Sequence, residues 1–288
     1  MRDEDLTELR TAIDAIDDQL LALFNQRAQL AQRVAEVKLQ RGEGGHFHRP
    51  EREAQVLKRL VAQNPGPLPP MAVVRLYREI MSACLALERP LVVAYTDGEQ
   101  TRASGAVAQH FGHGVEALAF DTLEEVLRET EVGAVDYGVV PREYWHDGAV
   151  RFGVDALIRF HLQLCGAVLQ RTRRRDGEVV SKRFWVVSRV PVPPSGTDVT
   201  QVMVSPPDRP GALAQLLADL ARRGVNLAAI ESRPLAVAAG EGRDAMQFFL
   251  ELQGHRDDPP LAAALEDLDQ RSKVRLLGSY PQEVFHEL

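Results

Sequence analysis

Apolar residues recur every three or four positions along the first 40 residues, and residues 5–41 contain no proline or glycine. This spacing puts the apolar side chains on one face of a single long helix. At 1.5 Å per residue the helix would be about 55 Å long, more than one small domain covers. We therefore expect it to lie across the interface of a homodimer. The apolar positions are Leu6, Leu9, Ile13, Ile16, Leu20, Leu23, Leu30, Val34 and Val37.

Two shorter helices complete the predicted N-terminal domain, residues 1–89. Gly42, Gly44 and Gly45 interrupt the first helical pattern, and Pro50 stands where helices begin. The second helix is expected from about residue 50 to 63. A third helix follows the NPGPLPP turn and ends near residue 89. This domain is therefore predicted to be all-helical.

At residue 90 short apolar strands begin to alternate with helices, which predicts a parallel α/β sheet. Two longer strands that flank the RRRDGE segment are expected to form a hairpin, which ends this domain at residue 189. A linker, residues 190–198, leads to a last domain, residues 199–288. Its order of strand, helix, strand, strand, helix, strand is ferredoxin-like. The predicted fold class is thus multidomain: α, then α/β, then α+β.

Composition and charge restrict the classes of function. The 288 residues are 45% hydrophobic, as in a globular protein, and the net charge of −7 gives no overall basic field for nucleic acid. The charged N-terminus and the lack of a long apolar run predict neither a signal segment nor a membrane span. Cys84 and Cys165 are the only cysteines, which favours a reducing cytoplasm.

Histidines occur in two close pairs, His46 with His48 and His110 with His113. Neither pair has carboxylate or cysteine company with metal-ligand spacing. We expect these side chains in loops and on the surface, and we predict no metal and no cofactor.

Cations occupy unexpected positions in the long helix. Arg27 stands within the apolar stripe, and Lys38, eleven residues later, lies about 20° away on the same face. Arg10 lies about 100° from that face and cannot serve the same pocket from the same helix. These side chains either extend over the core to reach solvent or bind an anion. The position of Arg27 within the stripe favours an anion site.

The third predicted helix carries Tyr77, Met81, Cys84 and Glu88 on one face. A carboxylate in such a row is unusual. From spacing alone, Glu88 fits a solvated helix end or a functional position equally well.

The N-terminal domain resembles the all-helical chorismate mutase of the bifunctional chorismate mutase–prephenate dehydratase family. The similarity rests on Leu9–Arg10, on NQRAQLA around Arg27, on Val37–Lys38, and on the segments RPEREAQVL and LYREIMSACLALE. The resemblance covers about residues 5–90. The resemblance implies conversion of chorismate to prephenate in the biosynthesis of phenylalanine and tyrosine.

The same resemblance assigns a role to each site residue. Arg27, with Arg10 of the other protomer, would hold the carboxylates of chorismate. Lys38 would contact a carboxylate and the ether oxygen, and protonated Glu88 would donate to that oxygen. Glu53 would accept a hydrogen bond from the ring hydroxyl. The ring-carboxylate end would be lined by Arg52 and Cys84.

The middle domain resembles prephenate dehydratase incompletely. Asp97, Gln100 and Arg102 replace the glycines and the aromatic residue of the first family motif. In the second motif Glu143 is retained, whereas Tyr144 and Trp145 replace Asn and Ser. The third motif is represented by Lys182, Arg183 and Phe184, with lysine in place of the catalytic Thr.

The second lobe of the dehydratase is also missing from this sequence. A Thr hydroxyl can donate a proton to a leaving hydroxide, which an ammonium in the same geometry cannot do. We therefore expect a scaffold without dehydratase activity that connects the mutase to the last domain.

The last domain resembles the ACT regulatory domain of the same family, through RPGALAQLL at 209–217 and ESRPL at 231–235. Free N–H groups at a helix start can receive a carboxylate, and Gly211 allows close approach to the backbone. Glu231 and Asn226 could bind an α-ammonium, and the resemblance implies phenylalanine as the effector. The expected contacts are Pro210, Gly211, Ala212, Leu213, Asn226, Glu231, Ser232, Arg233 and Pro234.

These expectations combine into a cytoplasmic, homodimeric chorismate mutase that senses phenylalanine. Three alternatives stay open: a relative acting on an aminated or isomeric chorismate, a bifunctional mutase and dehydratase, and a non-catalytic protein that reports phenylalanine to another enzyme. Glu53 favours a substrate with a ring hydroxyl. The sign of the effector's action and the choice between dimer and tetramer are left open.

Overall fold

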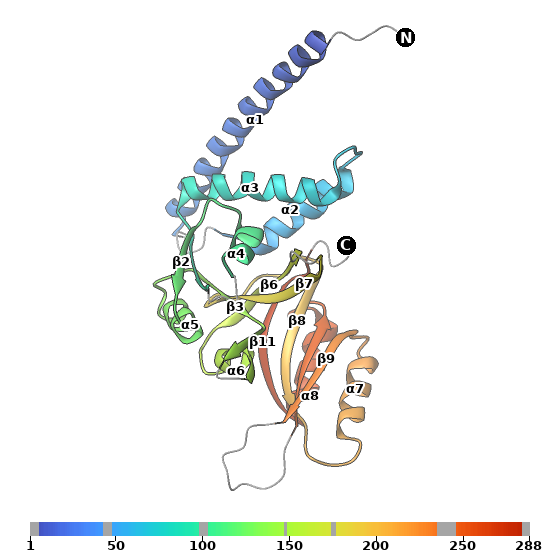
Figure 1. Cartoon of the computed structure of the whole chain (residues 1–288). Helices are drawn as coiled ribbons and strands as arrows, with labels where there is room; N and C mark the ends of the chain where they lie inside the picture. The colour runs from blue at the N-terminus through green and yellow to red at the C-terminus, as the bar shows by residue number, and fades with distance from the viewer. Residues whose placement is uncertain are drawn as a thin grey trace.

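The computed structural model describes residues 6–42, 48–97, 103–146, 149–173, 177–234 and 246–283. Its N-terminal part consists of α1 (Leu6–Gln40), α2 (Pro50–Gln63) and α3 (Pro70–Glu88). The C-terminal half of α1 packs against α3, and its N-terminal half projects away from the molecule (Figure 1). Every position of the predicted apolar stripe is exposed, by 42–67%. The predicted helices are confirmed, and α1 presents an apolar face without an intramolecular partner among the described residues.

The middle sheet has the strand order β2-β1-β3-β7-β6. The parallel strands are β1 (Val92–Thr96), β2 (Glu116–Phe120) and β3 (Tyr137–Pro141). The predicted hairpin of β6 (Gln163–Arg173) and β7 (Val179–Ser188) is confirmed, and β7 joins the sheet antiparallel to β3. The sheet is therefore mixed, because a hairpin strand must run opposite to its neighbour.

Helices α4 (Ala103–Phe111) and α5 (Leu123–Val132) connect the parallel strands. Thr122 and Glu125 form a reciprocal capping box at the start of α5. A separate hairpin of β4 (Glu143–His146) and β5 (Ala149–Phe152), followed by the short α6 (Gly153–Leu157), was not predicted as a hairpin from the sequence.

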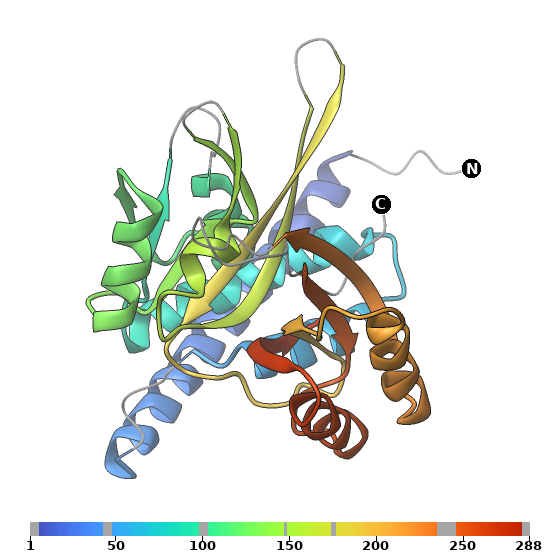
Figure 2. The same ribbon diagram turned by 90° about the horizontal axis from the view of Figure 1, so that it is seen from below.

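The C-terminal domain is ferredoxin-like, as predicted. It contains β8 (Asp198–Ser205), α7 (Ala212–Arg222), β9 (Leu227–Pro234), β10 (Met246–Gln253), α8 (Pro259–Asp269) and β11 (Lys273–Pro281). The strands form a sheet in the order β11-β8-β10-β9, and α7 and α8 pack on one face of it (Figure 2). This arrangement buries the core residues Val202, Leu216, Leu250 and Leu268.

The other face of this sheet packs on the middle domain. Leu164 and Trp185 of the middle domain share one buried cluster with Phe249, Leu277 and Tyr280 of the C-terminal domain. At the closest approach, a Cβ on Gly278 would lie 2.1 Å from the carbonyl oxygen of Leu164. Strands β6 and β11 therefore meet so tightly that this position requires glycine.

The predicted linker is itself packed. The buried imidazole of His255 hydrogen-bonds the carbonyl of Val192 through Nε2 at 2.9 Å. The Asp198 carboxylate accepts from the Ser195 amide at 2.9 Å and from the Ser195 hydroxyl at 2.7 Å. These bonds hold residues 190–198 against the C-terminal domain. None of the helices in the described ranges combines the length and apolarity that a bilayer crossing requires.

Candidate active site

The packing of α1 on α3 brings Arg27, Lys38 and Glu88 together, and we name these residues the α1–α3 charge cluster. Burial raises the pKa of the Glu88 carboxyl, and the positive charges of Lys38 and Arg27 oppose the rise without cancelling it. Arg27 and Lys38 are half-buried. The cluster therefore combines two cations with a carboxyl that holds its proton more strongly than usual. Cys84, one helical turn before Glu88, is buried.

Arg10 and Arg52 lie apart from this cluster. Arg10 is exposed on the projecting half of α1. It stands 17 residues before Arg27, or about 25 Å along the helix axis. Arg10 therefore cannot reach the cluster of its own chain. Arg52 is exposed on α2.

Glu53 does not join the charge cluster. Its carboxylate receives a hydrogen bond from Arg78 Nε at 3.1 Å, and His48 Nε2 lies 3.4 Å away. Burial would raise the pKa of Glu53, but the hydrogen bond with His48 and the charge of Arg78 outweigh it and lower the pKa to about 2. Among the described residues, Arg78 and His48 hold the Glu53 carboxylate, and its contact with a ring hydroxyl stays a prediction.

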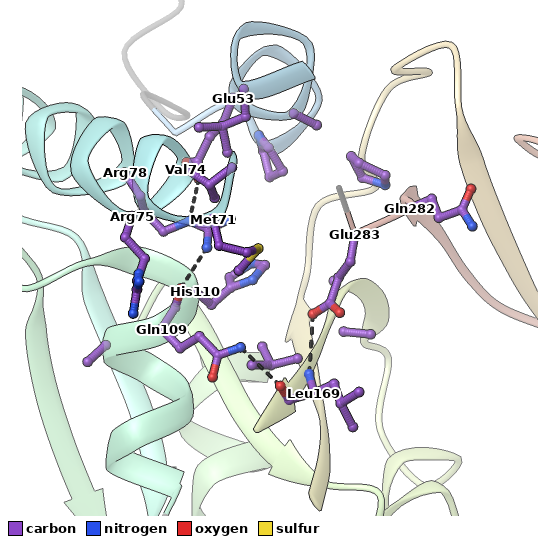
Figure 3. Close-up of a pocket in the computed structure, with 18 of the residues that line it drawn as sticks. Glu53, Met71, Val74, Arg75, Arg78, Gln109, His110, Leu169, Gln282 and Glu283 are labelled. Atoms are coloured by element: carbon purple, nitrogen blue, oxygen red, sulfur yellow. Dashed lines mark hydrogen bonds and ion pairs between the residues drawn. The ribbon is translucent and has the colours of Figure 1, made fainter. Parts of the chain in front are cut away.

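Glu53 instead lines a pocket of about 600 Å³ between α2, α3, α4, β6 and residues 281–283 (Figure 3). We name it the junction pocket. Arg78, besides binding Glu53, donates from Nη1 to the carbonyl of Gln109 at 2.8 Å. Glu283 points toward β6 and accepts from the amide of Leu169 at 3.3 Å. Burial raises the pKa of Glu283 to about 7, against the lowering effects of the Leu169 bond, Arg78 and Arg183.

Two histidines that the sequence placed on the surface lie at this junction. His110 is half-buried in the pocket wall, where burial and the charge of Arg78 lower its pKa to about 3, so the ring is neutral. His48 bonds the buried Tyr137 hydroxyl at 2.9 Å through Nδ1. His113, the other described histidine of the two pairs, is exposed and pairs with Glu79. The local sequence pattern around these histidines does not predict these contacts. His46 lies outside the described residues.

The effector residues divide into separate groups. Gly211 adopts φ +82° at the start of α7, next to Ala212 and Leu213. Ser232 pairs with Phe248 on the strand face that carries the helices, whereas Glu231 pairs with Phe249 on the opposite face. Asn226 precedes β9, at the end opposite to Pro234. The structure therefore does not bring Glu231 or Asn226 together with Gly211.

Glu231 already has cationic partners. Arg142 of the middle domain contacts it at 2.5 Å and Arg233 at 3.0 Å. The guanidinium of Arg233 also stacks over the ring of Phe152, 3.4 Å from its centroid. The Glu231 carboxylate is thus paired with two arginines, and its pair with Arg142 joins the two domains.

The dehydratase-like residues lie near one end of the β3–β7 pair. Pro141 pairs with Phe184, so Glu143 and Lys182 follow at the same edge of the sheet. Phe184 is fully buried, whereas Glu143 and Arg183 are exposed. Asp97 accepts hydrogen bonds from the Ser104 hydroxyl at 3.1 and 3.2 Å. Gln100 and Arg102 lie outside the described residues.

No group of three or more His, Cys, Asp or Glu side chains in the described ranges is arranged to hold a metal ion.

Three protein families match successive parts of the chain. Residues 9–89 match the chorismate mutase type II family, residues 93–174 match prephenate dehydratase, and residues 200–270 match the ACT domain. The solved structure of GqqA, described as a novel type of quorum quenching acylase, covers 67% of this chain and 95% of its own at 26% identity and TM-score 0.55. A prephenate dehydratase from Arthrobacter aurescens in complex with L-Phe covers 67% of this chain and 90% of its own, at 21% identity and TM-score 0.52.

Relatives that extend over the whole chain carry both enzyme names. The bifunctional chorismate mutase/prephenate dehydratase of Pseudomonas aeruginosa is 33% identical and covers 99% of this chain and 100% of the relative. That of Neisseria gonorrhoeae is 32% identical and covers 98% of each chain. The first alignment spans 368 positions against 288 residues here, so the relatives contain residues without a counterpart in this chain. This chain belongs to the bifunctional chorismate mutase/prephenate dehydratase family.

Proposed function

We propose that the α1–α3 charge cluster converts chorismate to prephenate, with Arg10 supplied by a second copy of the chain. The observation that carries the proposal is a carboxyl of raised pKa beside two half-buried cations. Chorismate has two carboxylates and an enolpyruvyl ether, which these charges complement. No nucleophile or metal is needed for the concerted rearrangement.

Catalysis at this site rests on positioning and charge stabilisation. Arg27 and Arg10 of the second copy clamp the carboxylates in a compact conformer. Lys38 and protonated Glu88 then donate to the ether oxygen, which gains negative charge as its bond to carbon breaks. The role of Glu53 toward the ring hydroxyl remains a prediction, and it requires release from Arg78.

The exposed apolar surface of α1 is the reason for proposing a second copy of the chain. The apolar stripe of this helix is 42–67% exposed, and such a continuous apolar face favours burial against another helix. A second copy packed there would also supply the arginine that the cluster cannot obtain from its own chain. We therefore propose a homodimer as the catalytic unit.

Prephenate dehydratase activity is the second candidate function. The match at residues 93–174 and the whole-chain relatives favour the bifunctional alternative over the expected inactive scaffold. Loss of this activity remains a prediction that rests on Lys182 in place of Thr and on the shorter chain.

Product identification tests both functions. The purified chain is incubated with chorismate at neutral pH, and prephenate and phenylpyruvate are separated and quantified without acid. Formation of prephenate supports the mutase proposal, and enzyme-dependent phenylpyruvate identifies a bifunctional enzyme. Prephenate incubated without protein measures spontaneous loss. If chorismate is consumed only at the uncatalysed rate, the mutase proposal is wrong.

Glu88 makes the mutase rate depend on pH. Because the protonated carboxyl is the donor, activity is expected to be highest below its raised pKa and to fall as the pH rises through that value. Glu88→Gln keeps a donor but removes the titration, so its kcat/KM should stay level over the same range. Profiles of both proteins between pH 5 and 9 check this. A wild-type profile that stays level, or a Gln variant with the same fall, would show that another group controls the rate.

Phenylalanine is proposed to bind near Gly211, at the start of α7. A ligand specific for the folded state stabilises it by about 2.7 kcal/mol at a hundredfold excess over Kd. We expect the melting temperature to rise with phenylalanine in the wild type and Gly211→Val to lose the rise, because the side chain blocks approach to the backbone.

Gly224→Val is the matched control for this measurement. Gly224 also has positive φ, +72° against +82° at Gly211, and neither added Cβ meets a heavy atom within 4 Å. Both variants therefore carry similar backbone strain, but Gly224 lies at the other end of α7. If both variants keep or both lose the phenylalanine-dependent rise, the site is not at Gly211.

A further inference from the structure

We propose that the junction pocket binds a small carboxylate with an apolar body and no ammonium group, through Arg75 and Arg171. Glu53 lines this pocket, but the α1–α3 charge cluster and the residues near Gly211 do not. Binding at this pocket therefore goes beyond the proposed mutase function.

The shape of the junction pocket suits a small organic molecule. Its volume of about 600 Å³ lies within the range of ligand sites, which often form where domains meet. The walls come from α2 and α3 of the helical part, from α4 and β6 of the middle domain, and from the end of the C-terminal domain. An occupant would contact all three parts of the chain.

The apolar lining of the pocket favours a ligand with an apolar body. Leu57, Val74 and Val168 contribute buried aliphatic side chains, and Met71 and Leu169 add half-buried ones. Such a surface binds a ring or a short hydrocarbon chain through burial of apolar area.

Two arginines of the pocket favour a ligand that carries a carboxylate. Arg75 of α3 and Arg171 of β6 both line the pocket and are exposed, and neither has an ion-pair partner within the described ranges. Arg78 is already engaged by Glu53 and Gln109. Two guanidinium groups thus remain available to bind a carboxylate.

The carboxylates of the pocket do not favour a ligand that carries an ammonium group, because each is either paired or has a raised pKa. Glu53 is held by Arg78 and His48, and Glu79 is held by His113. The pKa of Glu283 is raised to about 7, so at neutral pH a large fraction of its carboxyl groups is protonated and uncharged. The neighbouring His110 is neutral as well, since its pKa is lowered to about 3. No fully charged, unpaired carboxylate lines this pocket among the described residues, which distinguishes its ligand from an amino acid.

Calorimetric titration of the full chain with 3-phenylpropionate tests the proposal. This probe has a phenyl ring and a carboxylate but no ammonium, and 3-phenylpropanamide is its uncharged counterpart. We expect the acid to bind and the amide to bind about tenfold more weakly or worse, because a charge-assisted bond is lost. Equal affinity for the two compounds, or no binding of the acid at millimolar concentration, would overturn the proposal.

Variants locate the binding site. Arg75→Gln and Arg171→Gln should each weaken binding of the acid about tenfold, whereas Arg59→Gln should not. Arg59 is a matched control, since it is exposed on α2 and bonds only Gln63 among the described residues. Binding that survives both pocket substitutions places the probe elsewhere and overturns the proposal.

Two further variants separate this site from the others. Lys38→Ala removes a cation of the α1–α3 charge cluster, and Gly211→Val blocks the proposed effector site. Binding of the acid should persist in both, and its loss in either would transfer the probe to that site. Because chorismate is absent throughout, failure here leaves the mutase proposal untouched.

Discussion

Lys38→Ala should lower kcat/KM for the conversion of chorismate to prephenate by about 10²–10³-fold, the usual effect of losing a donor to developing negative charge. The structure gives the reason, since Lys38 acts electrostatically on Glu88 from the neighbouring helix. The lost ammonium would leave only Glu88 to donate to the ether oxygen. Initial rates of chorismate consumption measure the effect.

Arg33→Ala is the matched control for this experiment. Arg33 is an exposed cation on the same helix, outside the charge cluster. It should keep nearly wild-type kcat/KM, and circular dichroism should show that both variants remain folded. A Lys38 variant that stays within about threefold of the wild type would remove the central support for the active site.

Mixing two inactive variants should restore activity if the sites are shared. Arg10 lies about 25 Å along α1 from Arg27, so each site must take its Arg10 from the other copy. In a heterodimer of Arg10→Ala and Lys38→Ala, one site regains both residues and the other lacks both. Random reassortment yields heterodimers in half of the population, and therefore about a quarter of wild-type activity.

Arg27→Ala mixed with Lys38→Ala provides the contrast. Both residues belong to the cluster of one chain, so neither site in that heterodimer is complete. This mixture should stay inactive after unfolding and refolding together, while the first mixture recovers. Equal behaviour of the two mixtures, with heterodimers shown by native mass spectrometry, would rule out the shared arrangement.

The sequence was sufficient for features that depend on local periodicity. The stripe from Leu6 to Val37 predicted α1, and the angle between Arg27 and Lys38 followed from the geometry of one helix. Their proximity to Glu88 also depends on how α1 packs on α3, and the stripe did not show this, because its residues stay exposed. The ferredoxin-like fold was equally predictable, because the strand and helix patterns follow one another in the order strand, helix, strand, strand, helix, strand.

Features that depend on distant partners could not be predicted. Glu53 is held by Arg78, 25 residues away, and Glu231 by Arg142, 89 residues away. The local sequence pattern does not predict which cation will pair with a given carboxylate in the folded chain. The same limit applies to His110, whose burial results from the meeting of α4 with the helical domain and β6.

The contact between Gly278 and Leu164 has a consequence for how this chain can be divided. Because β6 and β11 share a buried cluster, the C-terminal domain is packed on the middle domain through its core. Residues 90–283 should unfold in one cooperative transition, and a cut at residue 198 would expose Leu164 and Trp185 to water. A C-terminal domain exchanged between relatives should therefore fold well only if β6 is exchanged with it.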